Sequence, residues 1–286
     1  MTTANILPSN TTGVPPVPPE AHQRVGISNQ HVFSELLTQA LTEPGLISEA
    51  YRRFHRFSIS NQLLAAIQLR ERDMALAPIA SFSHWQTLGR KVLRGEKALA
   101  LFMPVTIRQK VKDEETGEDQ PTGKAFTRFV LKRQWFSLNQ TEGAEYIEPL
   151  AIPEWDAAQA LAKLDIQEGR FVMVNGNVQG YALDRTIAIN PLAALPHKSR
   201  FHELAHVVLG HTTGAGCWDT ASVSRRIQEA EAEGAAYLLC TLLDLPGRIE
   251  ARGYIQSWLN GQELPERSAQ RIFSAAQSIL AAGKPE

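Results

Sequence analysis

The feature that most constrains the fold of this 286-residue chain is the sequence His202-Glu203-x-x-His206. On an α-helix, residues four positions apart lie one turn from each other on the same face, so both imidazoles can reach one metal ion. Glu203 projects roughly 100° around the helix from His202, where it can act on water without being a ligand itself. The sequence therefore predicts a helix here, and it requires another element that supplies a third ligand.

That third ligand is expected in the Ala-rich stretch 229–239, which is strongly helical in composition. Glu229 and Glu233 are four residues apart and share a face of this predicted helix. With Glu229 as a ligand, Glu233 lies one turn further on and can accept a hydrogen bond from a ligating histidine, a partner that metal-bound imidazoles usually need. The alternative is an acidic face that contacts solvent.

His211 is a weaker candidate for the third ligand. It follows His206 by five residues, so on a continuing helix its side chain would point roughly 140° away. Gly210 is a good helix terminator, and we expect His211 to cap the helix end. The ligand set is typical of Zn²⁺ or another divalent transition metal such as Mn²⁺, with Glu203 as general base toward water.

The composition is that of a soluble globular protein, with 43% hydrophobic and 21% charged residues. No apolar run approaches the ~20 residues that span a bilayer, and the N-terminal segment does not have the pattern of a signal peptide. The two cysteines, Cys217 and Cys240, give no disulfide framework, which fits a reducing compartment. We therefore expect a cytoplasmic protein with no membrane partner.

The charge is unevenly distributed along the chain. Residues 45–135 contain 16 Lys and Arg against 9 Asp and Glu, a net charge of +7. The remainder contains 13 against 21, a net charge of −8. A basic first half joined to an acidic second half suggests two separate tasks, with a polyanion as the partner of the first. The alternative is ordinary variation of surface charge.

The first half of the chain has the pattern of a small α+β domain. Residues 1–21 are rich in Pro and Thr and predict a flexible tail, and the domain itself is expected over 22–140. An acidic, exposed hairpin tip is expected at 112–124. Three helices and two β-prone runs are predicted around it, at residues 29–45, 46–58, 61–72, 83–111 and 125–138.

The second half is predicted to be mainly helical with a small sheet, so the fold class of the whole chain is α+β. Turn residues and prolines mark a linker at 141–153, and the second domain is expected over 154–286. Its strands are predicted at 171–174 and 186–190. Besides the helix of the His-Glu-x-x-His motif, helices are predicted at 154–165, 226–243, 254–260 and 266–282.

The second half resembles the gluzincin metallopeptidases. The resemblance rests on His202-Glu203-x-x-His206 and, 23 residues later, Glu229-x-x-Ala232-Glu233. Glu233 stands where those enzymes often have Asp or Asn. The resemblance implies a zincin-like domain whose edge strand lines the substrate cleft. Tyr181 is a candidate electrophilic partner near that cleft, and the alternative is that its ring is packed in the core.

The first half combines cations with aromatic rings in residues 51–56 and 84–104. Cations can follow the phosphates of a nucleic acid, while exposed rings stack on unpaired bases. The alternative is that the rings belong to the core and that the cations form a solvated rim around it.

This half also resembles a known family. Its motifs are Asn61-x-x-Leu64, Trp85, Gly89-Arg90-x-Val92-x-x-Gly95-Glu96 and Phe136-x-x-x-Gln140-Thr141. They are similar to the N-terminal domain of ArdC-type antirestriction proteins, which are encoded on conjugative plasmids. In that family the domain binds single-stranded DNA and precedes a zincin-like domain. The candidate DNA-binding residues are Arg52, Arg53, Arg56, Asn61, Trp85, Arg90, Lys91, Arg94 and Lys97.

The resemblance implies a protein that protects plasmid DNA entering a new host. The metal domain would hydrolyse a peptide bond in a protein of the restriction system. A second hypothesis is a protein that only binds single-stranded DNA, with the metal as a structural clip. Structural zinc sites usually have four protein ligands, and the sequence offers three. A third is a metallopeptidase whose basic domain binds an acidic protein.

Overall fold

The computed structural model describes residues 31–112, 119–147, 152–173, 177–212, 224–259 and 264–285. The predicted Pro-rich tail, Cys217 and residues 113–118 of the acidic hairpin tip lie outside these ranges. Within them, the mixture of helices and small sheets confirms the predicted α+β class.

Three helices begin the described chain and form the core of the first half. They are α1 (Val32–Thr42), α2 (Leu46–Phe54) and α3 (Ile59–Arg70), close to the predicted positions. Gly45, with a φ of 81°, separates α1 from α2, a backbone conformation that glycine adopts without strain. Nine of the twelve residues of α3 are buried, as expected for a helix that is apolar on all sides.

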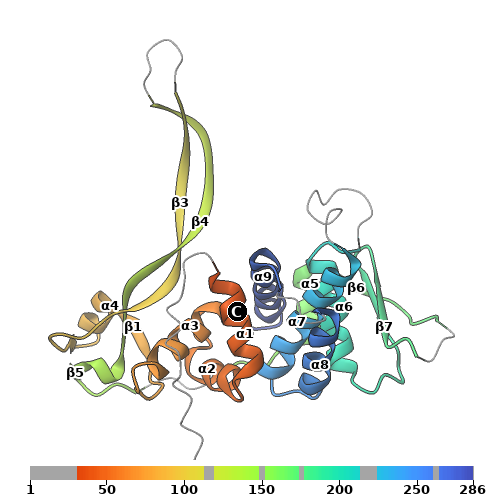
Figure 1. Ribbon diagram of the computed structural model, residues 1–286, viewed down its shortest axis with the longest axis horizontal. Coiled ribbons are helices and arrows are strands. Elements are labelled where there is room, and N and C mark those ends of the chain that lie inside the picture. Colours follow the sequence, from red (N-terminus) through yellow and green to blue (C-terminus); the bar gives the residue numbers. More distant parts are fainter. Residues whose placement is uncertain are drawn as a thin grey trace, which may run out of the picture.

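A long antiparallel hairpin follows, made of β3 (Leu99–Lys112) and β4 (Asp119–Ser137). The short strand β1 (Ile79–Ser81) pairs only with the base of β4, which gives the sheet order β1-β4-β3. Figure 1 shows that the rest of the hairpin extends away from the body of the molecule. The predicted hairpin is therefore present, and only its base belongs to a larger sheet.

A second, smaller sheet lies beside the base of the hairpin. It pairs β2 (Arg90–Val92) with β5 (Thr141–Gly143), and a 3-10 helix, η1 (Leu138–Gln140), leads from β4 into β5. The predicted β-prone run begins at residue 83, but residues 83–87 belong to helix α4 (Phe82–Thr87). The hydroxyl of Ser81 accepts a hydrogen bond from the backbone N–H of His84 and so caps that helix.

The second half has three strands in the order β6-β8-β7 and five helices in its described residues. The strands are β6 (Gln167–Glu168), β7 (Gly180–Leu183) and β8 (Thr186–Ile189). The helices are α5 (Ala157–Leu164), α6 (Pro196–Val208), α7 (Arg225–Leu242), α8 (Arg248–Leu259) and α9 (Glu266–Ala282). The predicted helices are all present, with shifted ends.

The predicted strand at 171–174 is wrong in its described part, residues 171–173, which form no strand. Val172 and Met173 are 70% and 48% exposed, so their apolar character does not reflect burial in a sheet. Besides β6, the strand β8 pairs with β7 and not with residues 171–173. A tight turn joins β7 to β8, and Asp184 in this turn has a φ of 49°. β7 therefore becomes an edge strand of this sheet.

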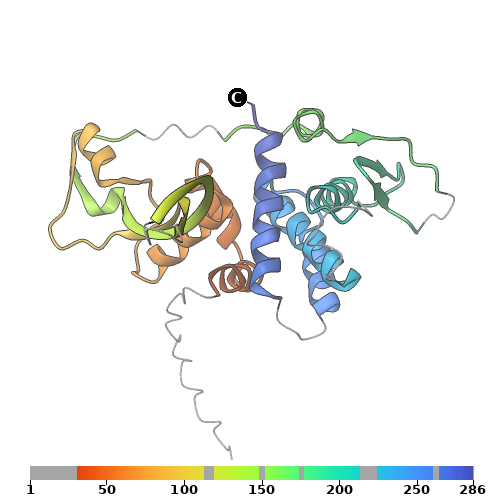
Figure 2. The ribbon, with the colours of Figure 1, turned by 90° about the horizontal axis from the view of Figure 1, so that it is seen from above.

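Helix α9 lies between the two halves, as the views of Figures 1 and 2 both show. The carboxylate of Glu266 at its start accepts hydrogen bonds from the backbone N–H groups of Phe33 (2.9 Å) and Ser34 (2.8 Å) in α1. Near its end, the Ile279 carbonyl accepts a hydrogen bond from the indole of Trp155. Buried side chains of both halves form one continuous core, and the division into two domains stays a prediction.

In the described part of the chain, no helix is long and apolar enough to cross a membrane.

Candidate metal centre

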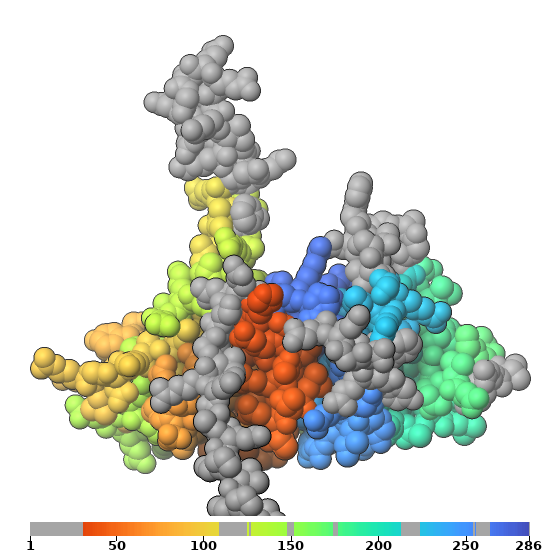
Figure 3. All heavy atoms as spheres, viewed as in Figure 1, coloured from red at the N-terminus to blue at the C-terminus, as the bar shows by residue number. Residues whose placement is uncertain are grey.

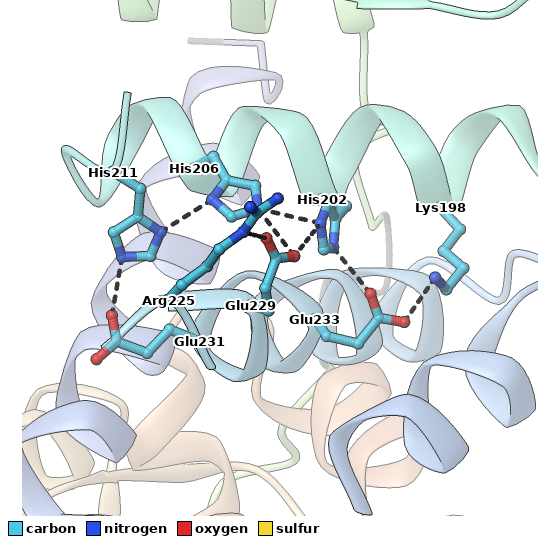
Figure 4. Close-up of polar contacts among 8 residues, drawn as sticks. All are labelled: Lys198, His202, His206, His211, Arg225, Glu229, Glu231 and Glu233. Carbon is cyan, nitrogen blue, oxygen red and sulfur yellow. Dashed lines mark hydrogen bonds and ion pairs between the residues drawn. The ribbon is translucent and has the colours of Figure 1, made fainter. Parts of the chain in front are cut away.

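The two helices of the predicted site pack against each other. Helix α6 begins with Pro196 in its first turn, where the missing N–H costs no hydrogen bond. In α7, the hydroxyl of Ser224 caps the first turn. The small residues that follow in α7 let neighbouring helices approach closely, and a Cβ on Gly234 would lie only 2.7 Å from Ile272 of α9. This packing brings the histidines of α6 opposite the glutamates of α7 (Figure 4).

The three predicted ligands converge on one point. The Nε2 atoms of His202 and His206 are 3.1 Å apart. The Oε2 atom of Glu229 lies 3.4 Å from the first of these nitrogens and 3.5 Å from the second. In a tetrahedral zinc site with bonds of ~2.0–2.1 Å, two ligand atoms are separated by roughly 3.3–3.4 Å. The triangle therefore has the size that a divalent transition metal requires.

The Nδ1 atom of His202 is held by a second glutamate. It lies 2.8 Å from Oε2 of Glu233, whose other oxygen lies 2.6 Å from the ammonium group of Lys198. If Nε2 binds a metal, Nδ1 carries the ring proton, and this N–H donates a hydrogen bond to the carboxylate. Glu233 thus has the position that the sequence predicted for it. Lys198 was not predicted, although it precedes His202 by four residues and so lies on the same helical face.

The Nδ1 atom of His206 is held by His211, at a distance of 3.0 Å. The Nε2 atom of His211 in turn lies 3.0 Å from Oε2 of Glu231, which also accepts a hydrogen bond from Arg271 of α9 at 3.0 Å. His211 therefore does more than the predicted capping of the helix end. The predicted direction of the His211 side chain, away from His206, is wrong because the helix does not continue. Gly210 has a φ of 74°, which turns the chain back toward His206.

The electrostatics of the cluster favour a positive charge between the ligands. Burial opposes the charged form of His202, but hydrogen bonds to Glu229 and Glu233 outweigh burial and raise the pKa of this histidine to about 9. Hydrogen bonds from both histidines hold the pKa of Glu229 well below its usual range. A cation at this position is therefore stabilised by the surrounding carboxylates, which is the charge balance that a divalent metal needs.

Glu203 lies beside the three ligands and is only 9% exposed. Burial raises the pKa of its carboxyl group, while the neighbouring histidines act in the opposite direction. Its side chain contacts the backbone of β7, because a Cβ on Gly180 would lie 3.2 Å from Oε1 of Glu203. This is the environment of a carboxylate whose affinity for a proton is increased, as a general base requires.

A cavity of about 630 Å³ opens over this cluster. The edge strand β7 contributes Gly180, Tyr181 and Ala182 to its wall, opposite residues of α6 and α7. Tyr181 is half-buried, and its hydroxyl donates a hydrogen bond to the carbonyl of Arg170 at 3.3 Å. The predicted cleft beside an edge strand is thus present, and a catalytic role of Tyr181 stays a prediction.

The structure assigns different surroundings to the candidate DNA-binding residues. Trp85 has no exposed surface, and its indole N–H donates to the carbonyl of Phe136 at 2.9 Å. A fully buried ring cannot stack on a base, so the prediction for Trp85 is corrected to a core role. Arg90 is half-buried and binds Thr141 as well as the carbonyl of Ala144, which holds β2 against β5.

Asn61 also has a structural role. Its amide group donates to the carbonyl of Phe102 at 3.0 Å and accepts from the N–H of the same residue at 2.8 Å. Gln68, two turns later on α3, makes the same pair of bonds with Ala100. The two side chains replace a neighbouring strand along the free edge of β3. Asn61 is therefore committed to the fold, and a contact with DNA is not its primary role.

The remaining candidates are exposed cations in two groups. The first lies on α2 and in the turn after it, and the second lies on β2 and in the following loop. These residues are Arg52, Arg53 and Arg56 in the first group, and Lys91, Arg94 and Lys97 in the second. Arg52 lines a cavity together with Trp155 and His197 of the other half. Contact of these cations with DNA stays a prediction.

Two features together define the class of this protein. A module of three helices and a long β-hairpin comes first in the chain. It is followed by a zincin-like arrangement, in which two histidines and a glutamate from two helices lie beside an edge strand. Residues 39–136 match the family model of the N-terminal domain of anti-restriction factor ArdC. No curated protein sequence matches the chain.

Two solved structures of the antirestriction ArdC protein from the R388 plasmid match the chain. The metal-free structure is 21% identical, with a TM-score of 0.54, over 89% of this chain and 94% of that chain. The Mn(II)-bound structure is 18% identical, with a TM-score of 0.48, over 88% of this chain and 97% of that chain. Residues 39–136 therefore match the ArdC N-terminal domain, and the similarity to the metal-free structure shows that the chain has the ArdC fold. Both findings confirm the resemblance to ArdC-type proteins found in the sequence.

Proposed function

We propose that this chain is an antirestriction protein that binds single-stranded DNA of an incoming conjugative plasmid in the cytoplasm. Its second half would be a metal-dependent peptidase that acts on a protein of the restriction system. The match of residues 39–136 to the ArdC N-terminal domain supports the first part of this proposal. The cluster of His202, His206, Glu229 and Glu203 supports the second.

The observation that carries the peptidase proposal is the position of Glu203. A metal that only stabilises the fold is usually enclosed by four protein ligands. Here three ligands face a cavity of about 630 Å³, and a buried carboxylate stands next to them. An open coordination position and an adjacent base are the two requirements for metal-assisted hydrolysis. This arrangement favours a peptidase over a structural clip.

The residues of the cluster have complementary tasks in such a reaction. His202, His206 and Glu229 would hold Zn²⁺ or Mn²⁺, and the bound ion would supply a Lewis acid for a peptide carbonyl and would lower the pKa of a bound water. Glu203 takes the proton of the attacking water and then transfers it to the leaving amine. The outer edge of β7 has no strand partner among the described residues, so an extended peptide can pair with it along the cavity.

The proposal is tested by the survival of a conjugated plasmid in a restricting recipient, with wild type compared with Glu203→Gln. The substitution removes the base but leaves the three ligands and the shape of the side chain. We expect Glu203→Gln to keep wild-type metal content and affinity for single-stranded DNA, and to lose protection of the plasmid. His206→Ala serves as the control that loses the metal itself.

Each outcome decides between the hypotheses. Loss of protection in both variants supports hydrolysis as part of the function. Loss in His206→Ala alone indicates a metal that is needed only for the structure. Full protection in both variants contradicts the peptidase proposal and leaves DNA binding as the protective activity.

A further inference from the structure

The outer part of the β3–β4 hairpin has no layer of protein packed on it in the described structure. We call it the arm, defined as residues 103–112 of β3 with their partners 119–130 of β4. Below it, Leu99 and Leu101 are fully buried in the core. Ten residues of strand extend for roughly 30 Å, and Figure 1 shows the arm extending away from the body. The coloured part of the hairpin in Figure 3, nearest the body, also stands clear of it. An isolated two-stranded ribbon is only marginally stable in water, which favours a function that requires a bound partner.

The charged side chains at the base of the hairpin and in the adjoining part of the arm are all positive. Residues 99–108 and 125–137 contain Arg and Lys but no Asp or Glu. Their four cations, all exposed, are Arg108, Arg128, Lys132 and Arg133. The acidic residues of this hairpin are confined to 113–119. The mutual repulsion of the four cations is relieved when a polyanion binds. The charge therefore favours a nucleic acid as the partner.

An aromatic ring lies among these cations. Phe129 is 56% exposed and pairs directly with Pro104 across the hairpin. Directly opposed residues of an antiparallel pair lie on the same face, and the two faces alternate along each strand. Phe129 therefore shares a face with Thr127 and Arg108, while Arg128 and Lys132 lie on the other face. The ribbon is a single layer, so long cationic side chains from both faces can reach one bound strand.

We propose that the arm and its base bind single-stranded DNA, with an unpaired base stacked on Phe129. Phosphates would be bound by Arg108 and Arg128 of the arm and by Lys132 at its base. This inference rests on the proposed function and assigns its DNA-binding surface. This surface differs from the one expected from the sequence. Of the residues expected there, Trp85 is buried in the core and Asn61 is bonded to the edge of β3. An exposed ring beside cations is the combination that binds single strands without a specific sequence.

The first test measures the affinity of the full-length protein for single-stranded oligothymidylate. We expect Phe129→Ala to weaken binding roughly 5- to 150-fold, because one stacked base is lost. Phe129→Tyr keeps a flat ring and is expected to restore the affinity. Ile249→Ala is the matched control, since this side chain is 78% exposed on α8, away from the arm. Equal affinity of Phe129→Ala and wild type would overturn the stacking role.

The second test uses the dependence of binding on salt. For single strands the slope of log K against log salt changes by about 0.7 for each phosphate contact. The double substitution Arg128→Ala/Lys132→Ala is therefore expected to reduce the slope by about 1.4. Arg185→Ala/Arg248→Ala removes the same charge elsewhere and is expected to leave the slope nearly unchanged. An equal change in both double variants would show a general charge effect and contradict a contact at the arm.

Wild-type protein separates this inference from the proposed function. If wild type binds oligothymidylate and the arm variants bind equally well, the arm inference fails and the proposed function stands. If wild type does not bind oligothymidylate, the single-strand part of the proposed function fails and the arm inference fails with it. If Phe129→Ala weakens duplex binding as much as single-strand binding, base stacking is wrong, because paired bases are not available to the ring.

Discussion

The candidate metal ligands His202 and His206 are each held in place by a neighbouring side chain. Each ligating histidine has its second ring nitrogen held by a specific partner, Glu233 for His202 and His211 for His206. These partners determine which nitrogen of each ring is free to bind a metal. The two partners differ in kind, since one is a carboxylate and the other is an imidazole that is itself held by Glu231.

At this scale we predict that Glu233→Gln and His211→Ala each weaken metal binding roughly 10- to 100-fold. Glu233→Gln removes the negative charge of the acceptor that fixes the orientation and tautomer of His202, and His211→Ala removes the partner of His206 entirely. The measurement is a competition titration of Zn²⁺ or Mn²⁺ against a chelating dye. His197→Ala is the control on the same helix, because His197 lines a different cavity. Unchanged affinity in His211→Ala would show that the contact between His206 and His211 does not support the site.

At the scale of elements, the first half depends on how its long hairpin is attached. Two amide side chains of α3, those of Asn61 and Gln68, bind the backbone of Phe102 and Ala100 on the free edge of β3. The unpaired N–H and C=O groups of an exposed strand edge can pair with another chain and cause aggregation, and a helix that covers the edge prevents such pairing. The helix therefore anchors the base of the arm and at the same time protects it.

We predict that Asn61→Leu lowers the free energy of unfolding by about 1–3 kcal/mol, because the N–H and C=O groups of Phe102 lose their partners. Urea denaturation measures this change. Gln86→Leu introduces the same apolar side chain at an exposed position of α4, and it is expected to be nearly neutral. Below the unfolding transition, affinity for single-stranded DNA is expected to be unchanged. A large loss of DNA affinity with normal stability would instead support a direct contact of Asn61 with DNA.

At the scale of the whole molecule, α9 connects parts that are far apart in the sequence. Its Arg271 binds Glu231 next to the metal centre. Its Phe273 contacts Phe33 of α1, and Phe33 stacks on Phe102 of β3 at a centroid distance of 4.8 Å. The candidate metal centre therefore contacts α9 directly, and the base of the hairpin is connected to the same helix through Phe33 of α1.

We predict a single cooperative unfolding transition, seen at the same midpoint by tryptophan fluorescence and by circular dichroism. Glu266→Ala is expected to lower the free energy of unfolding by about 0.5–2 kcal/mol, since it removes the cap of α1. Glu250→Ala, at an exposed position of α8, is the control. Two separate transitions would show that the halves fold independently despite their common core.

The sequence alone determined the local features of this protein. Helical spacing predicts α1, α3 and α7, and the spacing of His202 and His206 requires both on one face of α6. These features depend on residues that are close together in the chain, so periodicity and motif spacing are sufficient. The same is true of Glu229 and Glu233, whose separation alone places them on one helical face.

Only the tertiary structure decided the features that depend on distant residues. The sequence contains Trp85, Asn61 and Val172, but their side-chain types do not indicate which of them is buried, bonded to a strand edge or exposed. The role of His211 depends on one left-handed glycine, Gly210, and on Glu231 from another helix. The position of α9 depends on contacts that span more than two hundred residues, and local sequence patterns carry no record of such pairings.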